Sequence, residues 1–265
     1  MIYSVSLDAS NEEVGKSVEI SLILKKLNIE STVVGISPQV DKVKSYLDGI
    51  GIKHNFIEKV PTAKVQQEFL NYLKENLQMG DILVIAGKFE DGIDPVYLVD
   101  MATIAAKAMV HLVVDLPYDT VMDILPLHPL LIKPNEAELK AWYHKENRNL
   151  DVSEEIELAH DMVIQGADHI LLSLGENGAA IVNLMHAYLA KAPEVEVKNP
   201  QGKGEALLGT FLAGMLKNHM PVRNLADSIA AASDTVRKDK LTDFKNNTEL
   251  QKLIIAEKIT FEEAK

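Results

Sequence analysis

The sequence has no cysteine among its 265 residues. This absence excludes disulfide bonds, thiolate metal sites and cysteine nucleophiles. Long apolar runs are also missing, because stretches such as 109–114 are far shorter than the roughly 20 residues that a membrane span needs. The start, Met1–Leu7, lacks a basic segment and a long apolar run, so it indicates a first strand rather than a signal peptide. We therefore expect a soluble cytoplasmic protein without a membrane partner.

Basic residues are scarce, with 27 Lys and Arg against 39 Asp and Glu and a net charge of −12. A chain with this balance has no broad basic face for a polyanion, so we expect no nucleic-acid partner. A small anionic ligand is still compatible with this charge. Backbone N–H groups at a helix start hold phosphate without any excess of lysine or arginine.

Other signals are absent as well. The eight histidines show no metal-ligand spacing, so a zinc site has no support. No Gly-x-Gly-x-x-Gly follows the first predicted strand, which argues against a dinucleotide-binding enzyme. The sequence has no linker rich in Pro, Gly or Ser, no low-complexity tract and no internal repeat, so we expect a single domain over residues 1–265.

Short apolar runs alternate with segments of helical spacing along the chain. Several runs are continuously apolar, which is typical of parallel strands covered on both faces. The alternation predicts an α/β sandwich with a mostly parallel sheet. Strands are expected at Ile2–Leu7, Thr32–Ile36, Ile82–Ala86, His111–Asp115, Leu130–Lys133, His169–Leu174, Ala179–Val182, Glu194–Lys198 and Ala256–Phe261. Helices are expected around 18–27 and 65–77 and at Glu154–Gln165, Glu205–Lys217 and Asn224–Lys238.

A glycine-rich turn, Gly202-Lys203-Gly204-Glu205, precedes a long apolar helix. Such a turn leaves unpaired N–H groups at the helix start, and these suit an anion or a developing oxyanion. The alternative is structural. Two glycines before a helix often form only a tight turn, and a first-turn glutamate favours the helix dipole.

The segment 133–138 leads from a predicted strand into a helix, which is where open α/β sheets bind ligands. Asn135 and Glu138 are three residues apart and share one face of the first helical turn. The same spacing fits plain capping, with Asn135 as N-cap and Glu138 at the third helical position. Both interpretations hold together.

Two further strand ends are candidates. The segment Ser173-Leu174-Gly175-Glu176-Asn177-Gly178 joins two predicted strands, and its Asn-Gly chemistry alone favours a hairpin. Asp115 ends another predicted strand. It is a candidate ligand at a strand end, or it caps the segment 118–125.

In this order, the segments resemble the ribokinase/PfkB family of carbohydrate kinases, nearest to the branch of 1-phosphofructokinase and tagatose-6-phosphate kinase. The resemblance covers Met1 to about Val236. It rests on the start MIYSVSL, Gly15-Lys16, Asp115, Lys133-Pro134-Asn135-x-x-Glu138, Ser173-Leu174-Gly175-x-x-Gly178-Ala179 and Asn199-x-x-Gly202-x-Gly204-Glu205.

The resemblance implies a Rossmann-like three-layer α/β/α sandwich that transfers the γ-phosphoryl group of ATP, with Mg²⁺, to a hydroxyl of a sugar or sugar phosphate. Gly202, Lys203, Gly204 and Glu205 match the family's Gly-Ala-Gly-Asp segment, which supplies an anion hole and the residue that takes the hydroxyl proton. Asn135 and Glu138 match the element that organises metal and phosphates, which makes Glu138 the expected metal ligand. Positions of the nucleotide site are matched by Lys133, Asn135, Ser173, Gly175 and Gly178.

The chain departs from the family pattern at the chemistry. Glu205 replaces an aspartate and Lys203 replaces a small residue. A misplacement of roughly 1 Å can cost about 10²-fold in rate, so the longer carboxylate side chain matters. Lys203 either stabilises phosphate charge or plugs the hole and pairs with Glu205.

The sugar side departs further. The residues expected to bind substrate are Asp8, Glu12, Gly15 and Lys16, and little else of the family's sugar motifs remains. Too few residues separate these motifs to build the family's β lid, so we expect a fold without the lid and no oligomer paired through one. Two functions stay open: a sugar or sugar-phosphate kinase of reduced activity, or a non-catalytic regulatory protein that binds nucleotide or sugar.

Overall fold

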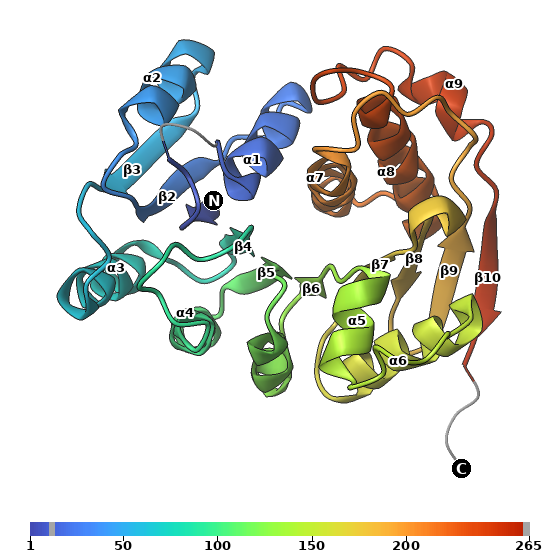
Figure 1. Ribbon diagram of the computed structural model, residues 1–265, viewed down its shortest axis with the longest axis horizontal. Helices are drawn as coiled ribbons and strands as arrows, with labels where there is room; N and C mark the ends of the chain where they lie inside the picture. The colour runs from blue at the N-terminus through green and yellow to red at the C-terminus, as the bar shows by residue number, and fades with distance from the viewer. Residues whose placement is uncertain (11–13, 262–265) are drawn as a thin grey trace. The chain divides into compact units, whose positions relative to one another are not determined.

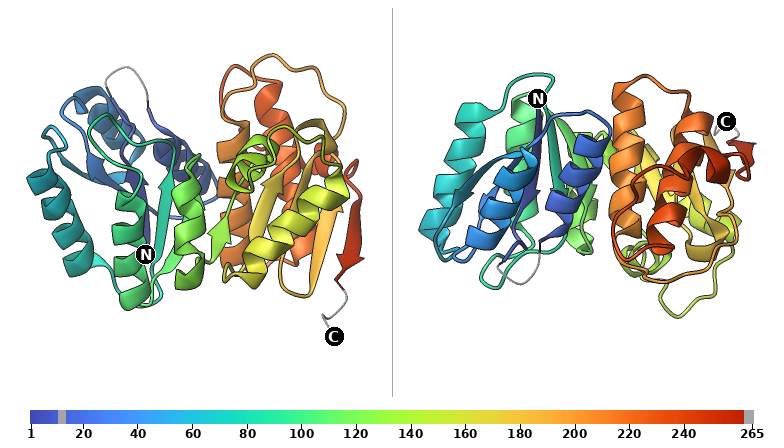
Figure 2. Two further views of the ribbon diagram at one scale, coloured as in Figure 1. Left: turned by 60° about the horizontal axis from the view of Figure 1, so that its bottom comes forward. Right: turned by 90° about the horizontal axis from the view of Figure 1, so that it is seen from above.

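A computed structural model describes residues 1–10 and 14–261 of the chain. The chain divides into two compact units, Met1–Leu130 and Leu131–Lys265. In each unit, strands alternate with helices that cover both faces of its sheet (Figures 1 and 2). No helix within the described residues is long and apolar enough to cross a membrane.

The described part of the first unit contains five parallel strands in the order β5-β4-β1-β2-β3. They are β1 (Ile2–Ser6), β2 (Thr32–Ile36), β3 (Lys53–Ile57), β4 (Ile82–Ala86) and β5 (His111–Asp115). The helices α1 (Lys16–Lys26) and α2 (Asp41–Ile50) cover one face, and α3 (Ala63–Asn76) and α4 (Tyr97–Lys107) cover the other (Figure 1). Every residue of β1 and β4 is buried, which explains the unbroken apolar character of β4. A 3₁₀ helix, η1 (Asp119–Leu127), follows β5.

The second unit has strand order β10-β9-β8-β7-β6, in which β6 and β7 are parallel and the other neighbours antiparallel. Its strands are β6 (Leu131–Ile132), β7 (Ile170–Ser173), β8 (Ala179–Val182), β9 (His186–Ala190) and β10 (Ala256–Thr260). Figure 1 shows α5 (Glu136–Trp142) and α6 (Val152–Ile164) on one face of this sheet. On the other face lie α7 (Lys203–Leu216), α8 (Pro221–Val236) and the short α9 (Asn247–Gln251).

The expected α/β class with a mostly parallel sheet is confirmed, and most expected strands and helices lie within a few residues of their predicted bounds. The strand expected at Glu194–Lys198 is wrong, because the N–H of Lys198 donates to the carbonyl of Val236 at the end of α8 rather than to a sheet. The sequence analysis missed β3 and β9, which are less apolar than the central strands and only partly buried. That residues 1–265 form one domain stays a prediction.

Two loops of the first unit are relevant to the expectation that lid strands are absent. No strand occurs among the described residues between β1 and α1, which are 7–10 and 14–15. The segment 58–62 between β3 and α3 likewise contains none. These short connections agree with the expectation that this chain lacks lid strands, which stays a prediction.

Gly35 lies where β1 and β2 approach closely. It pairs with Ser6, and a Cβ atom at position 35 would lie 1.9 Å from the Ser6 carbonyl oxygen. Any side chain there would push the two strands apart. Gly49 in α2 is the opposite case, since a Cβ atom there would meet nothing within 4 Å.

We expect Gly35→Ala to lower the free energy of unfolding by about 1–3 kcal/mol, the usual range for overpacking. The matched variant Gly49→Ala should leave stability unchanged or raise it by up to about 1 kcal/mol, because alanine favours a helix over glycine. Urea unfolding followed by circular dichroism measures both. Equal effects of the two substitutions would contradict the strand contact.

Candidate functional site

Two of the predicted segments meet at the carboxyl ends of β6 and β7. Asn135 and Ser173 form a parallel bridge. The backbone N–H and the hydroxyl of Ser173 both donate to the carbonyl of Pro134, at 3.0 and 3.2 Å. The structure therefore places the start of α5 directly beside the turn after β7.

Asn135 and Glu138 cap α5 reciprocally. The Asn135 Oδ1 atom accepts from the N–H of Glu138, and the Glu138 Oε2 atom accepts from the N–H of Asn135, both at 2.9 Å. The capping interpretation is thus confirmed. The capping box also holds both side chains at fixed positions beside the strand end.

The turn after β7 is a hairpin, as its Asn-Gly sequence indicates. A short 3₁₀ helix, η2 (Gly175–Asn177), links the antiparallel strands β7 and β8. Gly178 has φ +87°, and a Cβ atom there would lie 2.0 Å from the carbonyl oxygen of Ala190. Glycine is required because the chain after β9 passes directly over this turn.

The start of α7 is an N-terminus without a side-chain cap. Gly202 is its N-cap, in the left-handed region at φ +77°, and its carbonyl accepts the first helical hydrogen bond, from Ala206 at 2.9 Å. The N–H groups of the first turn therefore have no acceptor within the helix. These groups and the helix dipole attract an anion.

A pocket of about 1220 Å³ in the second unit brings most of these elements together. Six predicted residues line it: Asn135, Ser173, Gly175, Gly178, Lys203 and Gly204. Another part of its wall is apolar, formed by Ala192, Pro193, Val195, Leu207, Ile229 and Val236. The pocket thus combines an anion-attracting helix start with an apolar surface, and its volume suits a small-molecule ligand.

Charged side chains flank the helix start. Lys203 is among the residues that line the pocket. Burial and the nearby Glu155 raise the pKa of the Glu136 carboxyl, and the charges of Lys140 and Lys203 partly offset this. Lys140 itself pairs with the buried Glu155 at 2.9 Å. No predicted motif includes Lys140 or the apolar wall, which join the pocket only in the folded chain.

Four of the residues predicted for the nucleotide, metal and catalytic sites are not among those that line the pocket: Lys133, Glu138, Gly202 and Glu205. Lys133 and Glu205 are each only 5% exposed. The Lys133 Nζ atom lies 3.7 Å from where a Cβ atom of Gly204 would be, so this ammonium lies beside the first turn of α7. Their roles in the nucleotide and catalytic sites stay predictions.

Asp8, Gly15 and Lys16 lie in the first unit, after β1 and at the start of α1. The Asp8 carboxylate accepts from the Ser6 hydroxyl at 3.0 Å and from the Lys16 N–H at 3.2 Å. Burial outweighs these hydrogen bonds and raises the pKa of the Asp8 carboxyl. A Cβ atom on Gly87, in the loop after β4, would lie 2.0 Å from this carboxylate.

Two further predictions concern the substrate and the metal. Glu12 lies outside the described residues. Within the described residues, no three His, Cys, Asp or Glu side chains gather as a metal site. Mg²⁺ is commonly held by one or two carboxylates together with substrate phosphates. Glu138 is not among the pocket-lining residues and its Oε2 atom caps α5, so its role as a metal ligand stays a prediction.

Comparisons with known proteins identify relatives of this chain. D-tagatose-1-phosphate kinase of Bacillus licheniformis is 29% identical over 224 residues, 75% of this chain and 73% of that protein. 1-Phosphofructokinase of Escherichia coli K12 is 24% identical over 247 residues, 83% of this chain and 78% of that protein. A solved structure from Staphylococcus aureus, provisionally described as a phosphofructokinase, has a TM-score of 0.86 at 22% identity, covering 99% of this chain and 100% of that one.

These names confirm the expected branch, although the tagatose kinase among them is named for the 1-phosphate rather than the 6-phosphate. The family of pfkB carbohydrate kinases matches residues 20–247, which is most of the chain. This chain therefore belongs to the pfkB family of carbohydrate kinases.

Proposed function

We propose that this protein transfers the γ-phosphoryl group of ATP to a hydroxyl of a ketohexose phosphate. The observation that carries the proposal is the pocket of the second unit, where the uncapped start of α7 and the strand-end residues Asn135 and Ser173 share one cavity with an apolar wall. Membership of the carbohydrate kinase family supports the reaction class. The relatives named for 1-phosphofructokinase and D-tagatose-1-phosphate activity suggest the two substrates to test first.

The pocket accommodates the two ends of a nucleotide differently. The phosphates lie at the start of α7, where backbone N–H groups and the Lys203 ammonium attract negative charge. The base packs on the apolar wall that Leu207, Ile229 and Val236 help to form. Mg²⁺ bound with the nucleotide supplies neutralising charge, and Glu138 and Asn135 are the residues that would hold it.

Glu205 acts as the general base in this proposal. Its carboxylate takes the proton of the attacking sugar hydroxyl as the new O–P bond forms, while the bond to the bridging oxygen of ADP breaks and ADP leaves. The first-turn N–H groups of α7 stabilise the charge on the transferred group. Asp8, Glu12, Gly15 and Lys16 are proposed to bind the sugar phosphate.

A second candidate function is nucleotide binding without transfer, in a regulatory protein. One observation favours it: Glu205 is 5% exposed and does not line the pocket, whereas Lys203 does. Calorimetry and a turnover assay separate the two functions. ATP binding without product from any sugar phosphate would support the second and overturn the first.

We expect Glu205→Gln to lower kcat by about 10²- to 10⁴-fold, the usual contribution of a general base, with little change in the affinity for ATP. The measurement is ADP release with Mg·ATP and either fructose 1-phosphate or tagatose 1-phosphate, beside calorimetry of ATP binding. Glu157→Gln, on the exposed face of α6, is the matched control and should keep wild-type activity. Wild-type turnover by Glu205→Gln would remove Glu205 from the mechanism.

A second comparison uses two capping boxes among the described residues, at Asn135 on α5 and at Asp151 on α6. Asn135→Ala and Asp151→Ala should each lower the free energy of unfolding by about 1 kcal/mol. Only Asn135 lines the pocket, so only Asn135→Ala should also weaken ATP binding, by about tenfold. Calorimetry beside thermal unfolding tests this, and equal ATP affinity of the two variants would argue against nucleotide at α5.

A further inference from the structure

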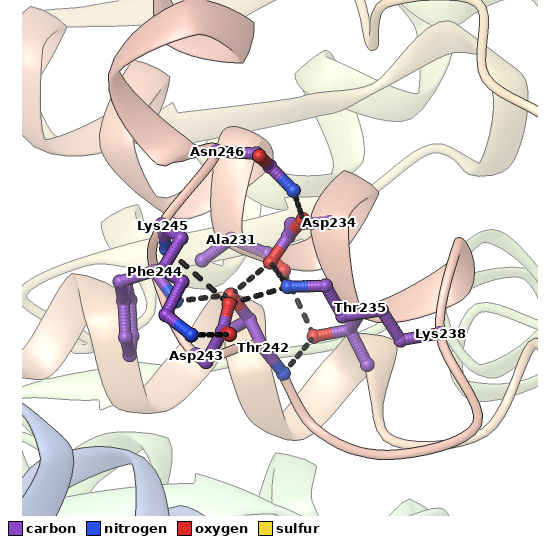
Figure 3. Close-up of polar contacts among 9 residues, drawn as sticks. All are labelled: Ala231, Asp234, Thr235, Lys238, Thr242, Asp243, Phe244, Lys245 and Asn246. Atoms are coloured by element: carbon purple, nitrogen blue, oxygen red, sulfur yellow. Dashed lines mark hydrogen bonds and ion pairs between the residues drawn. The ribbon is translucent and has the colours of Figure 1, made fainter.

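A buried carboxylate outside the proposed mechanism lies in the last turn of α8. Asp234 has an exposed fraction of 0%. Its carboxylate accepts three hydrogen bonds, from Lys238 Nζ at 2.7 Å, Thr242 Oγ1 at 2.5 Å and Asn246 Nδ2 at 2.9 Å (Figure 3). A buried charge persists only where such partners surround it, so this cluster is built around the Asp234 charge.

The three donors come from the start, middle and end of the segment 237–246, which connects α8 to α9. Thr235 adds a second attachment, because its hydroxyl accepts from the N–H of Thr242 at 3.1 Å and donates to the carbonyl of Ala231 at 2.9 Å. The Thr242 hydroxyl in turn accepts from the N–H of Phe244 at 2.9 Å (Figure 3). One turn of α8 thereby fixes the whole connection.

Charge and burial oppose each other at Asp234. Burial acts to raise the pKa of its carboxyl, but the hydrogen bonds from Lys238, Thr242 and Asn246 outweigh it and hold this pKa below its ordinary value. Lys238 also pairs with Asp243, whose side chain is 45% exposed. The same lysine thus joins one buried and one exposed carboxylate.

This connection also forms the surface on which the start of α7 rests. A Cβ atom on Gly202 would lie 2.6 Å from Cδ2 of Leu241, the neighbour of Thr242, and 3.4 Å from Cγ2 of Thr235. Gly202 therefore packs against Thr235, which binds the connection to α8, and against Leu241, which precedes the Asp234 partner Thr242. No room for even one methyl group is left between them and the N-cap of α7.

We propose that Asp234 is a positioning residue for the start of α7. Through Thr242 and Leu241 it fixes Gly202, and so the direction in which the N–H groups of residues 203–205 point. This inference rests on the proposed function, in which those groups hold phosphate. Shifts of roughly 1 Å at reacting groups can cost about 10²-fold in rate, so a rigid support for the N-cap has functional weight.

The first experiment needs no ligand. Asp234→Asn keeps the shape of the side chain and removes its charge, and Asp243→Asn does the same to the exposed partner of Lys238. We expect amide hydrogen exchange at residues 206–208, the first hydrogen-bonded amides of α7, to become about tenfold faster or more in Asp234→Asn and to stay at the wild-type rate in Asp243→Asn. Unchanged exchange in a folded Asp234→Asn protein would overturn the proposal.

The second experiment measures ligand discrimination. Calorimetry gives the ratio of the affinities for ATP and for adenosine, which isolates the phosphate contribution. We expect this ratio to fall about tenfold in Asp234→Asn, with adenosine affinity unchanged, and to hold in Asp243→Asn. A folded variant that loses both affinities equally would show a merely structural role.

Leu241→Ala keeps the polar cluster and removes only its contact with Gly202, so it tests the proposal should Asp234→Asn fail to fold. It should repeat both effects, and wild-type behaviour would overturn the proposed route through Leu241. A failure of the proposed function can be distinguished from a failure of the positioning role of Asp234. If the wild-type protein binds no ATP while exchange at 206–208 still depends on Asp234, the proposed function fails and the positioning role stands.

Discussion

The close contact between Gly202 and Leu241 is the constraint on which the candidate site depends. The N-cap of α7 adopts φ +77°, a conformation that favours glycine, and it packs against a leucine side chain with no space for a Cβ atom. This contact sets where the first turn of α7 begins. Because that turn supplies the unpaired N–H groups of the pocket, the position of one glycine decides the direction of the anion-binding groups.

A second backbone contact, at the carboxyl ends of β6 and β7, positions other residues of the candidate site. The bridge between Asn135 and Ser173 joins two segments that are 38 positions apart in the sequence numbering (173 − 135). The capping box at α5 then fixes Asn135 and Glu138 relative to that bridge. Backbone hydrogen bonds, rather than side-chain pairs across the pocket, therefore give this part of the site its geometry.

Much of this could be predicted from the sequence, because the signals are local. Continuous apolar strands predict a parallel sheet, and the spacing of Asn135 and Glu138 predicts a capping box, which the structure confirms. The prediction of a strand at Glu194–Lys198 was wrong for a physical reason. Its alternating valines suggest a strand, but the N–H of Lys198 finds its acceptor at the end of α8, and the segment instead lines the pocket through residues such as Val195.

What the sequence could not predict depends on contacts between distant segments. The difference between Asp115 and Asp234 in their surroundings is not visible in residue type, since both are buried aspartates at the end of an element. Only the folded chain shows that Asp234 gathers three donors from the following connection. The residues that support the turn at 202–205 therefore belong to none of the motifs identified in the sequence.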